Sequence, residues 1–182
     1  MGRQVKTLTL DVDIPISESL TRTQGWVLSA MQLYGPQLVN MLWRILGSEP
    51  DVCDAYQQTF LNLAHCLGGQ KPDNVKAYVF RTASNIAFSM LRRKIVERKN
   101  LPKLSEKTDA EKTEADIDNA FLRQQLRDSI SKLPEILREV ITLHDLAELP
   151  YAKVAKIIGI TEATARVYRC KALQLLAVMM NR

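Results

Sequence analysis

The side chains best suited to bind another molecule lie near the C-terminus of this chain, on a stretch rich in cations. Between residues 149 and 182 the sequence has six basic residues and a single acid, Glu162. Gly159 can adopt the positive φ of a tight turn, and Thr161 is a favoured N-cap for a helix that follows it. Two short helices joined by such a turn are typical of a helix-turn-helix, whose second helix enters the major groove of DNA. The chemistry predicted here is hydrogen bonding to phosphates and base edges.

The second of these expected helices offers both kinds of contact. Cations fix a protein on the phosphate backbone, whereas other well-placed side chains reach base edges. We expect Arg166, Arg169 and Lys171 to point outward, with Thr164, Arg166 and Arg169 as the candidates for base edges. The alternative is a scaffold of three helices with a solvated basic face. Apolar packing between the two helices is expected from Val154, Ile157, Ile158, Ile160 and Val167.

A second group of candidates lies on a long helix expected between residues 75 and 98. Aromatic side chains can stack on unpaired bases while cations hold the backbone of a single strand. Aromatic residues at helical spacing are more often core, and this is what we expect of Phe80 and Phe88. Tyr78, Arg81 and Asn85 have the polar character to face a strand of DNA. The whole group comprises Tyr78, Phe80, Arg81, Asn85, Phe88, Arg92, Arg93 and Lys94.

Neither catalysis nor metal binding is indicated. We find no Ser/His/Asp or Cys/His arrangement and no glycine-rich loop that would cradle phosphate. The cysteines Cys53, Cys66 and Cys170 show no CxxC spacing, and we expect them to be reduced, semi-buried apolar residues. Only His65 and His144 could join them as metal ligands. We therefore expect a protein that is not an enzyme and has no metal, cofactor or small-molecule substrate.

Composition and periodicity predict an all-α protein of two small helical domains. Gly and Pro each number only seven in 182 residues, and helix formers dominate. Apolar residues recur at helical spacing over residues 24–99 and 120–182, which we take as the domains. Residues 100–119 between them are rich in Lys, Glu, Asp and Thr and predict a flexible charged linker. Residues 1–23 lack helical periodicity and are expected to be a mobile tail.

Charge and hydropathy narrow the possible partners. The net charge of +5 suits a polyanion. No signal peptide is evident, and no apolar run approaches the ~20 residues that span a bilayer, so we expect a cytoplasmic protein without membrane insertion.

In the first domain, helices are expected over residues 24–47, 51–67 and 75–98, with Gly35 and Pro36 kinking or dividing the first. In the second, helices are expected over residues 120–132 and 135–146 before the helix-turn-helix.

Three segments, taken in their order along the chain, resemble a known family. The first comprises residues 34–38, Asp54, Ala55 and residues 57–61, and the second comprises residues 77–85 and 91–93. In the C-terminal part the matching residues are Leu133, Pro134, Arg138, Glu139, Val140, Val154, Ala155, Ile158, Gly159, Ile160 and Thr164. The pattern resembles the extracytoplasmic-function (ECF) sigma factors, small two-domain promoter-specificity subunits of bacterial RNA polymerase. The resemblance covers about residues 24–99 and 120–182.

The resemblance implies that the chain directs core polymerase to promoters by recognising the −10 and −35 elements and melting DNA. Polymerase docking is implied for Asp54, Gln57, Gln58 and Phe60. Contacts with the −10 element and strand separation are implied for Lys71, Asn74, Tyr78, Arg81, Asn85, Arg92 and Arg93. Recognition of the −35 element is implied for Thr164, Arg166, Val167, Arg169 and Lys171. The implied partners are core RNA polymerase, promoter DNA and an anti-sigma factor wedged between the domains.

Several positions depart from the family's usual pattern. Gln58 stands where Glu is usual, Tyr78 where Trp is usual, and Ser89 where Asp is usual. In the C-terminal helix, Tyr168 replaces a common Arg and Arg169 replaces a common apolar residue. Either the outward face of that helix is rotated, or the −35 sequence is unusual.

Two other functions fit the same residues. A stand-alone helix-turn-helix regulator would bind duplex DNA specifically without polymerase. A helical adaptor would bind only proteins, and charge reversal at Arg166 and Arg169 would leave its activity intact.

Overall fold

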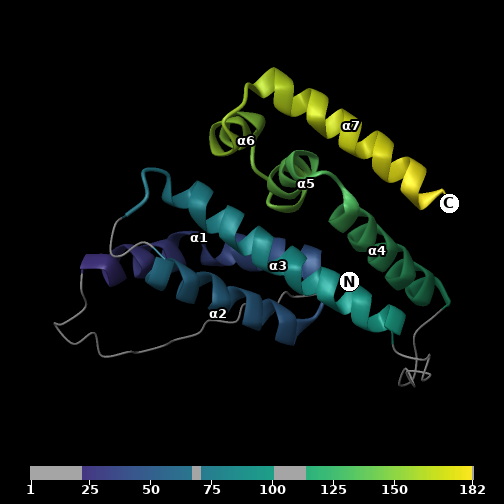
Figure 1. Ribbon diagram of the computed structural model, residues 1–182, viewed down its shortest axis with the longest axis horizontal. Helices are drawn as coiled ribbons and strands as arrows, with labels where there is room; N and C mark the ends of the chain where they lie inside the picture. The colour runs from purple at the N-terminus through teal and green to yellow at the C-terminus, as the bar shows by residue number, and fades with distance from the viewer. Residues whose placement is uncertain (1–21, 67–70, 101–113, 182) are drawn as a thin grey trace, which may run out of the picture.

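The computed structural model describes residues 22–66, 71–100 and 114–181, and every regular element in these ranges is helical. The prediction of an all-α fold is confirmed. Figure 1 shows α1–α3 gathered in one bundle and α4–α7 in another. In chain order the elements are α1 (Arg22–Leu46), α2 (Glu49–Cys66), α3 (Val75–Asn100), α4 (Glu114–Lys132), α5 (Glu135–Ile141), the π-helical turn η1 (Thr142–Leu146), α6 (Tyr151–Ile158) and α7 (Glu162–Met180).

The first bundle forms because apolar residues recur at helical spacing on α1, α2 and α3. Leu38 of α1 and Phe80 of α3 are completely buried where the helices meet. Although Pro36 lies within α1, the helix runs through it as one element, so the predicted division is not found. Gly35 allows α2 to approach closely, because a Cβ there would lie 2.9 Å from the hydroxyl oxygen of Tyr56.

The helix-turn-helix of the second bundle is confirmed in its local geometry. Gly159 ends α6 with a φ of 84°, a left-handed conformation that favours glycine. Thr161 caps α7, because its side chain accepts a hydrogen bond from the backbone N–H of Thr164 at 3.1 Å. Ala165 is completely buried where α7 crosses α6, and Val154 fills the core beneath it.

The helices reach beyond the expected boundaries on both sides of the linker. The third helix continues to Asn100, and α4 begins at Glu114 rather than at residue 120. The helix expected over residues 135–146 consists of α5 followed by the wider turn η1. Residues 101–113 and 1–21 lie outside the described residues, as do the predictions of a flexible linker and a tail there.

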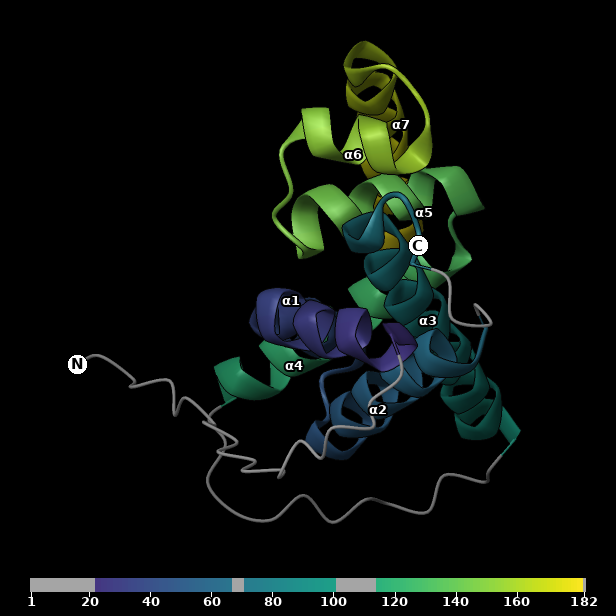
Figure 2. The ribbon, with the colours of Figure 1, turned by 90° about the vertical axis from the view of Figure 1, so that its left-hand side faces the viewer.

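The two bundles pack against each other. Helices α3 and α4 lie side by side in Figure 1 and contact each other, and α1 contacts η1. Figure 2 shows α5, α6 and α7 gathered above α1 and α2. The buried apolar residues of both bundles belong to one connected cluster. The chain is therefore seen here in a closed arrangement, with the second bundle covering part of α3.

Candidate nucleic-acid interface

The outward side of α7 exposes Arg166, Val167 and Lys171 to solvent. Val167 is 52 % exposed, so the prediction that it packs between α6 and α7 is wrong. The guanidinium carbon of Arg166 lies 5.2 Å from the centre of the Tyr151 ring, a cation–π distance. Arg166 also approaches the carboxylate of Glu162 to 3.6 Å, one helical turn earlier. These contacts hold the guanidinium at the surface while leaving it accessible to DNA.

Two predicted base-contacting residues of α7 make hydrogen bonds within their own domain. Nε of Arg169 donates to both carboxylate oxygens of Asp145 at 3.0 Å, and Nη2 donates to Oδ1 at 2.7 Å. This pairing raises the pKa of Arg169. Because Asp145 belongs to η1, Arg169 points back to its own domain and not outward as predicted. Thr164 contributes its N–H to the cap of α7, and its hydroxyl lies 2.8 Å from that of Thr161.

The second bundle occupies part of the predicted single-strand face of α3. Arg81 donates to the carboxylate of Glu139 in α5, from Nε to Oε1 at 3.1 Å and from Nη2 to Oε2 at 3.4 Å. Glu139 is buried, with 8 % of its surface exposed. Nε of Arg92 donates to the backbone carbonyl of Ser131 at 3.4 Å. The side chain of Asn85 is exposed on the same helix.

The start of α3 combines a structural cap with an exposed cation. Oδ1 of Asn74 accepts the backbone N–H of Ala77 at 3.0 Å, as an N-cap residue does. Tyr78 is half-buried and packs on the apolar core, whereas Lys71 is exposed. In the connection that leads into α3, residues 67–70 lie outside the described residues. The amide oxygen of Asn74 thus stabilises the helix, which the sequence analysis missed although Asn is a common N-cap.

The predicted docking residues of α2 line a groove between α2 and α3. Asp54, Gln57 and Gln58 are exposed there, and Gln58 donates to Oδ1 of Asn62 at 2.7 Å. Phe60 is only 6 % exposed and its ring centre lies 4.8 Å from that of Tyr56. In this arrangement the side chain of Phe60 belongs to the core, and its contact with polymerase stays a prediction.

Other residues of this groove were missed by the sequence analysis. Leu61 is 53 % exposed beside the docking residues. From α3 come Ile86, Ser89, Met90 and Arg93, so the groove has apolar walls with a cation at one side. Helical spacing could have identified Leu61, since it follows Gln57 by one turn. Arg93, for which the resemblance implies a −10 contact, also lines this groove beside the predicted docking residues.

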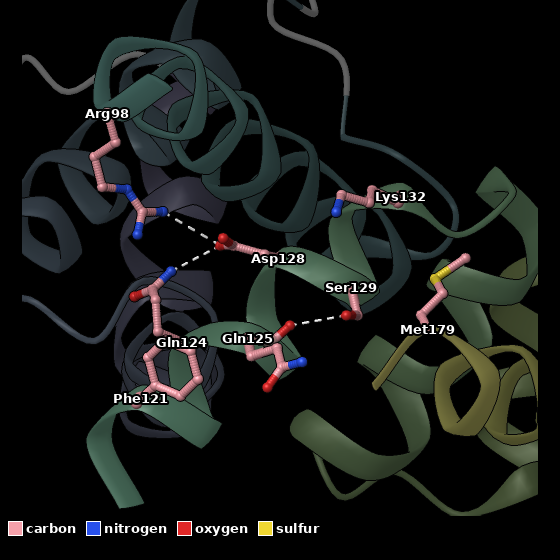
Figure 3. Close-up of a pocket in the computed structure, with 8 residues that line it drawn as sticks. All are labelled: Arg98, Phe121, Gln124, Gln125, Asp128, Ser129, Lys132 and Met179. Atoms are coloured by element: carbon pink, nitrogen blue, oxygen red, sulfur yellow. Dashed lines mark hydrogen bonds and ion pairs between the residues drawn. The ribbon is translucent and has the colours of Figure 1, made fainter. Parts of the chain in front are cut away.

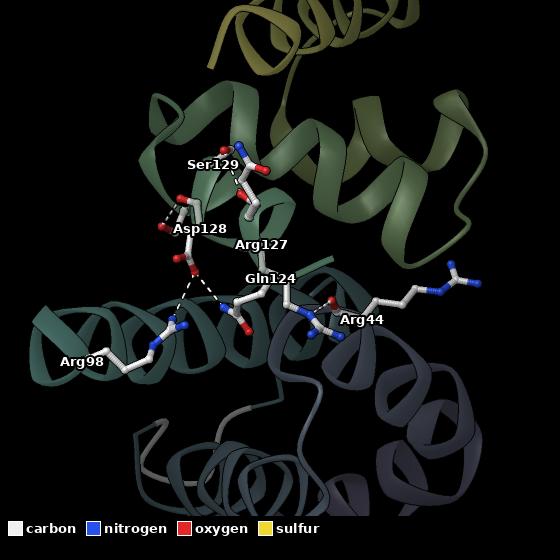
Figure 4. A network of polar contacts seen from close by, with 8 residues as sticks. Arg44, Arg98, Gln124, Arg127, Asp128 and Ser129 are labelled. Carbon is white, nitrogen blue, oxygen red and sulfur yellow. Dashed lines mark hydrogen bonds and ion pairs between the residues drawn. The ribbon is translucent and has the colours of Figure 1, made fainter. Parts of the chain in front are cut away.

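Polar contacts between the bundles form an interdomain seam, which we define as Arg44, Arg98, Arg127, Asp128 and Glu148. In Figure 4, Arg127 of α4 reaches the backbone of Arg44, and Nε donates to that carbonyl at 2.9 Å. Arg44 donates to the carbonyl of Leu146 at 2.9 Å and pairs with Glu148. Arg98 pairs with Asp128 at 3.3 Å. None of these long-range pairs was foreseen.

Beside the seam lies a shallow hollow between α3, α4 and the end of α7 (Figure 3). Phe121 at its edge is 71 % exposed, and Met179 lines the side formed by α7. Of the apolar residues in the periodic pattern of α4, Ile130 is buried whereas Phe121 and Leu122 are exposed. The apolar periodicity therefore predicted the helix correctly, but not which of its apolar side chains are buried.

Cations of the two bundles also face one another. Burial, and then the charge of Lys153, lower the pKa of Lys76. Burial and the charge of Arg92 likewise lower the pKa of Arg138. The charges of Glu135 and Glu139 offset part of this effect at Arg138.

Further predictions concern the cysteines, metal binding and membrane insertion. Cys53 and Cys170 are exposed, so the prediction that they are semi-buried is wrong for both. Within residues 22–66, 71–100 and 114–181, no group of three metal-binding side chains comes together. In the same part of the chain, no helix has the length and apolar character needed to cross a membrane.

Both bundles match models of known protein families. The model of Sigma-70 region 2 matches residues 30–95, which cover most of α1–α3. The model of Sigma-70, region 4 matches residues 123–176, which run from α4 into α7. This chain belongs to the sigma-70 family. Regions 2 and 4 in this order make it an RNA polymerase sigma factor.

A solved structure with a similar fold is known. This sigma factor is similar to CnrH in its complex with the cytosolic domain of CnrY, at 20% identity and a TM-score of 0.52 over 87% of this chain and 89% of that chain. It also matches RpoE in complex with the anti-sigma factor NepR from Bartonella quintana, at 19% identity and a TM-score of 0.48 over 85% of this chain and 96% of that one.

Proposed function

We propose that this sigma factor brings core RNA polymerase to promoters by holding two DNA elements at once. The second bundle would hold the duplex −35 element on α7. The first would dock on polymerase through α2 and hold an unpaired −10 strand on α3. The observation that carries the proposal is the N-capped α7, which presents Arg166, Val167 and Lys171 outward from a helix-turn-helix.

The chemistry of α7 supports binding to duplex DNA. Its cap and turn hold the first residues of the helix in a fixed direction. An α-helix fits the major groove, where arginine can bond two acceptors of guanine and an apolar group can contact the thymine methyl. Arg166 and Val167 supply these two groups, and Lys171 supplies a phosphate contact.

The exposed residues of α3 support the capture of a single strand. Taking a base out of the stack costs a few kcal/mol, which stacking and hydrogen bonds must offset. Asn85 offers a donor and an acceptor to an unpaired base, and Tyr78 offers a half-buried ring near it on the helix. Arg81 and Arg92 would hold the strand's phosphates.

Docking through α2 would use polar and apolar residues that line one groove. Interfaces between proteins combine these features, with apolar residues at the centre and polar ones around them. In this groove the exposed Asp54, Gln57 and Gln58 lie beside Leu61 and Met90. Because Gln58 replaces the family's usual Glu, this docking surface has one negative charge fewer.

Engagement of DNA would require the bundles to part. Arg81 and Arg92 now donate to Glu139 and Ser131 of the second bundle. A phosphate can take these donors only when the interdomain contacts break. Two elements bound through one tether raise the effective concentration of each, so we expect each domain alone to bind promoter weakly.

The proposed role is one of binding and not catalysis, exercised in the cytoplasm. The neighbouring structure of RpoE contains an anti-sigma factor, and we propose that this chain too has such an inhibitor. Such an inhibitor would bind the surfaces of the two bundles that separate when DNA binds.

Reconstituted transcription tests the proposal. Purified chain is added to bacterial core RNA polymerase with a library of promoter fragments from the source genome, and transcript starts are sequenced. We expect new starts that need both proteins. Specific DNA binding that does not depend on core polymerase would instead indicate a stand-alone regulator. Normal activity after charge reversal at Arg166 would indicate an adaptor that binds only proteins.

A further inference from the structure

Arg169 is bound in a way that differs from every other cation on α7. Its guanidinium makes three hydrogen bonds to Asp145, at 2.7–3.0 Å, through both Nε and Nη2. Such a two-pronged pair is more directional than a lysine contact, because the planar fork matches the two carboxylate oxygens. Asp145 is 24 residues earlier in the chain and lies in η1, before the helix-turn-helix begins.

The pair joins the middle of α7 to the segment that precedes α6. A second tether lies one turn earlier, where Arg166 covers the ring of Tyr151. That ring stacks on His144 with the two centres 3.9 Å apart, and Nδ1 of His144 lies 2.8 Å from the carbonyl oxygen of Leu149. Both tethers end on η1 or the start of α6, so together they set how far α7 is rotated about its own axis.

The rotation decides which residues face away from the domain. At about 100° per residue, positions 163, 167, 170 and 174 share one side of the helix. Ala163, Val167, Cys170 and Gln174 are all exposed, whereas Ala165, Ala172 and Leu176 on the other side are buried. Arg166 and Lys171 flank the exposed side, and Arg169 lies well away from it.

We propose that Arg169 is a positioning residue, and that the −35 element is read by the side of α7 formed by Ala163, Val167 and Cys170, with Arg166 and Lys171 at its edges. This inference rests on the proposed function. The small apolar groups of this side fit the methyl group of thymine, and Arg166 fits an adjacent guanine. The expected −35 element therefore has A·T pairs where α7 is apolar, next to a G·C pair.

Removing the charge of Asp145 should change DNA affinity in opposite directions, depending on whether Arg169 contacts DNA or positions α7. If Arg169 contacted DNA, Asp145 would compete with DNA for it and would repel nearby phosphates. Asp145→Asn would then strengthen binding to the −35 element. If Arg169 positions α7, the same substitution loosens the helix and weakens binding. Asp145 remains on η1 in either case, away from the exposed side of α7.

The test uses the full chain bound to core polymerase and a promoter library in which only the −35 element is randomised. We expect Arg169→Lys and Asp145→Asn each to loosen α7 and lower affinity about 5- to 20-fold for all selected sequences. The preferred bases should stay the same, because the buried Ala165, Ala172 and Leu176 still keep the same side of α7 outward. The double variant should be no weaker than either single one, because both remove the same pair. Arg166→Ala should erase the preference at one base pair, with a loss of about 5- to 150-fold there.

Controls separate positioning from mere loss of folding. Affinities are divided by the fraction of each variant that binds core polymerase, and thermal unfolding is recorded by circular dichroism. Lys171→Ala is the matched control on α7, and it should weaken all sequences and reduce the salt dependence. Arg169→Lys keeps the positive charge but removes the planar guanidinium. A loss of affinity in this variant therefore supports a role for the two-pronged pair with Asp145 and not for the charge alone.

Three results would overturn the inference. One is stronger binding by Asp145→Asn, another is altered base preference in Arg169→Lys, and the third is full affinity in both variants. If the wild-type holoenzyme selects a −35 sequence while one of these occurs, only the inference fails. If the wild-type holoenzyme selects no sequence at all, the proposed function fails with it.

Discussion

Arg44 and Arg127 cap helix ends in each other's domain. The carbonyl of Arg44, near the end of α1, accepts a hydrogen bond from Nε of Arg127 at 2.9 Å. The guanidinium of Arg44 in turn donates to the carbonyl of Leu146 at 2.9 Å, at the end of η1. Carbonyls at helix C-termini lack partners within the helix and carry partial negative charge. Exchanged caps of this kind link the bundles through backbone groups that each domain would otherwise leave to water.

Removing one of these caps should open the closed arrangement. Arg127→Gln shortens the side chain and removes its charge, so we expect a loss of about 1 kcal/mol and a roughly fivefold shift toward separated bundles. Energy transfer between dyes on the exposed Cys53 and Cys170, with Cys66 replaced by Ser, measures the separation.

Arg123→Gln is the matched control for this experiment. Arg123 lies on the same helix, and within the described residues its Nε donates to a carbonyl of that helix, that of Asn119, at 3.1 Å. We expect its energy transfer to equal that of the parent. Equal transfer in both variants would show that the cap does not hold the bundles together.

Asn85→Ala should impair opening of the −10 element. The exposed amide is the group proposed to bond an unpaired base, and losing such bonds costs about 1 kcal/mol, roughly fivefold in the opening equilibrium. Fluorescence of 2-aminopurine placed in the −10 strand reports the opening. Glu97→Gln, exposed on the same helix, serves as the control, and an equal loss in both variants would argue against a specific role for Asn85.

Gln58→Glu should strengthen docking on core polymerase. The substitution restores the acid usual in the family at an exposed position of the docking groove. An exposed ion pair contributes up to about 1 kcal/mol, so we expect a two- to fivefold gain in affinity that declines with added salt. Titration of labelled sigma factor with core polymerase measures it. Unchanged or weaker affinity at low salt would place the docking surface elsewhere.

Thr161→Ala should destabilise the second bundle. The substitution removes the acceptor for the N–H of Thr164, and loss of such a cap costs about 1 kcal/mol. Thermal unfolding should begin several degrees lower. Gln174→Ala, exposed on the same helix, should leave the melting temperature nearly unchanged. A variant at position 161 as stable as the parent would mean that the cap contributes nothing.

Local features of the fold could be predicted because neighbouring residues determine them. The positive φ of Gly159 and the cap at Thr161 depend on a turn of a few residues, and both predictions are confirmed. Helical periodicity also identified each helix of the described residues. Pro36 misled only about continuity, since packing against α2 and α3 keeps α1 in one piece.

The orientation of single side chains was less predictable because it depends on distant partners. Arg169 has the character of an outward cation, yet Asp145 binds it from η1. Phe60 lies among polar residues, yet Tyr56 and the core cover it. Arg81 has the polarity expected of a DNA contact, and nothing near it in the sequence reveals its pairing with Glu139. Such pairings are set by the tertiary arrangement and not by any local pattern.

Footprinting of the holoenzyme on a promoter that it transcribes tests the central claim most directly. Hydroxyl radicals report which DNA segments are covered, and permanganate reports unpaired thymines. We predict protection at the −35 and −10 elements together, unpaired thymines only around the −10 element, and loss of the −35 protection when Arg166 and Lys171 are both changed to Ala. A holoenzyme that covers no upstream DNA, or the same footprint from the chain without polymerase, would contradict the account.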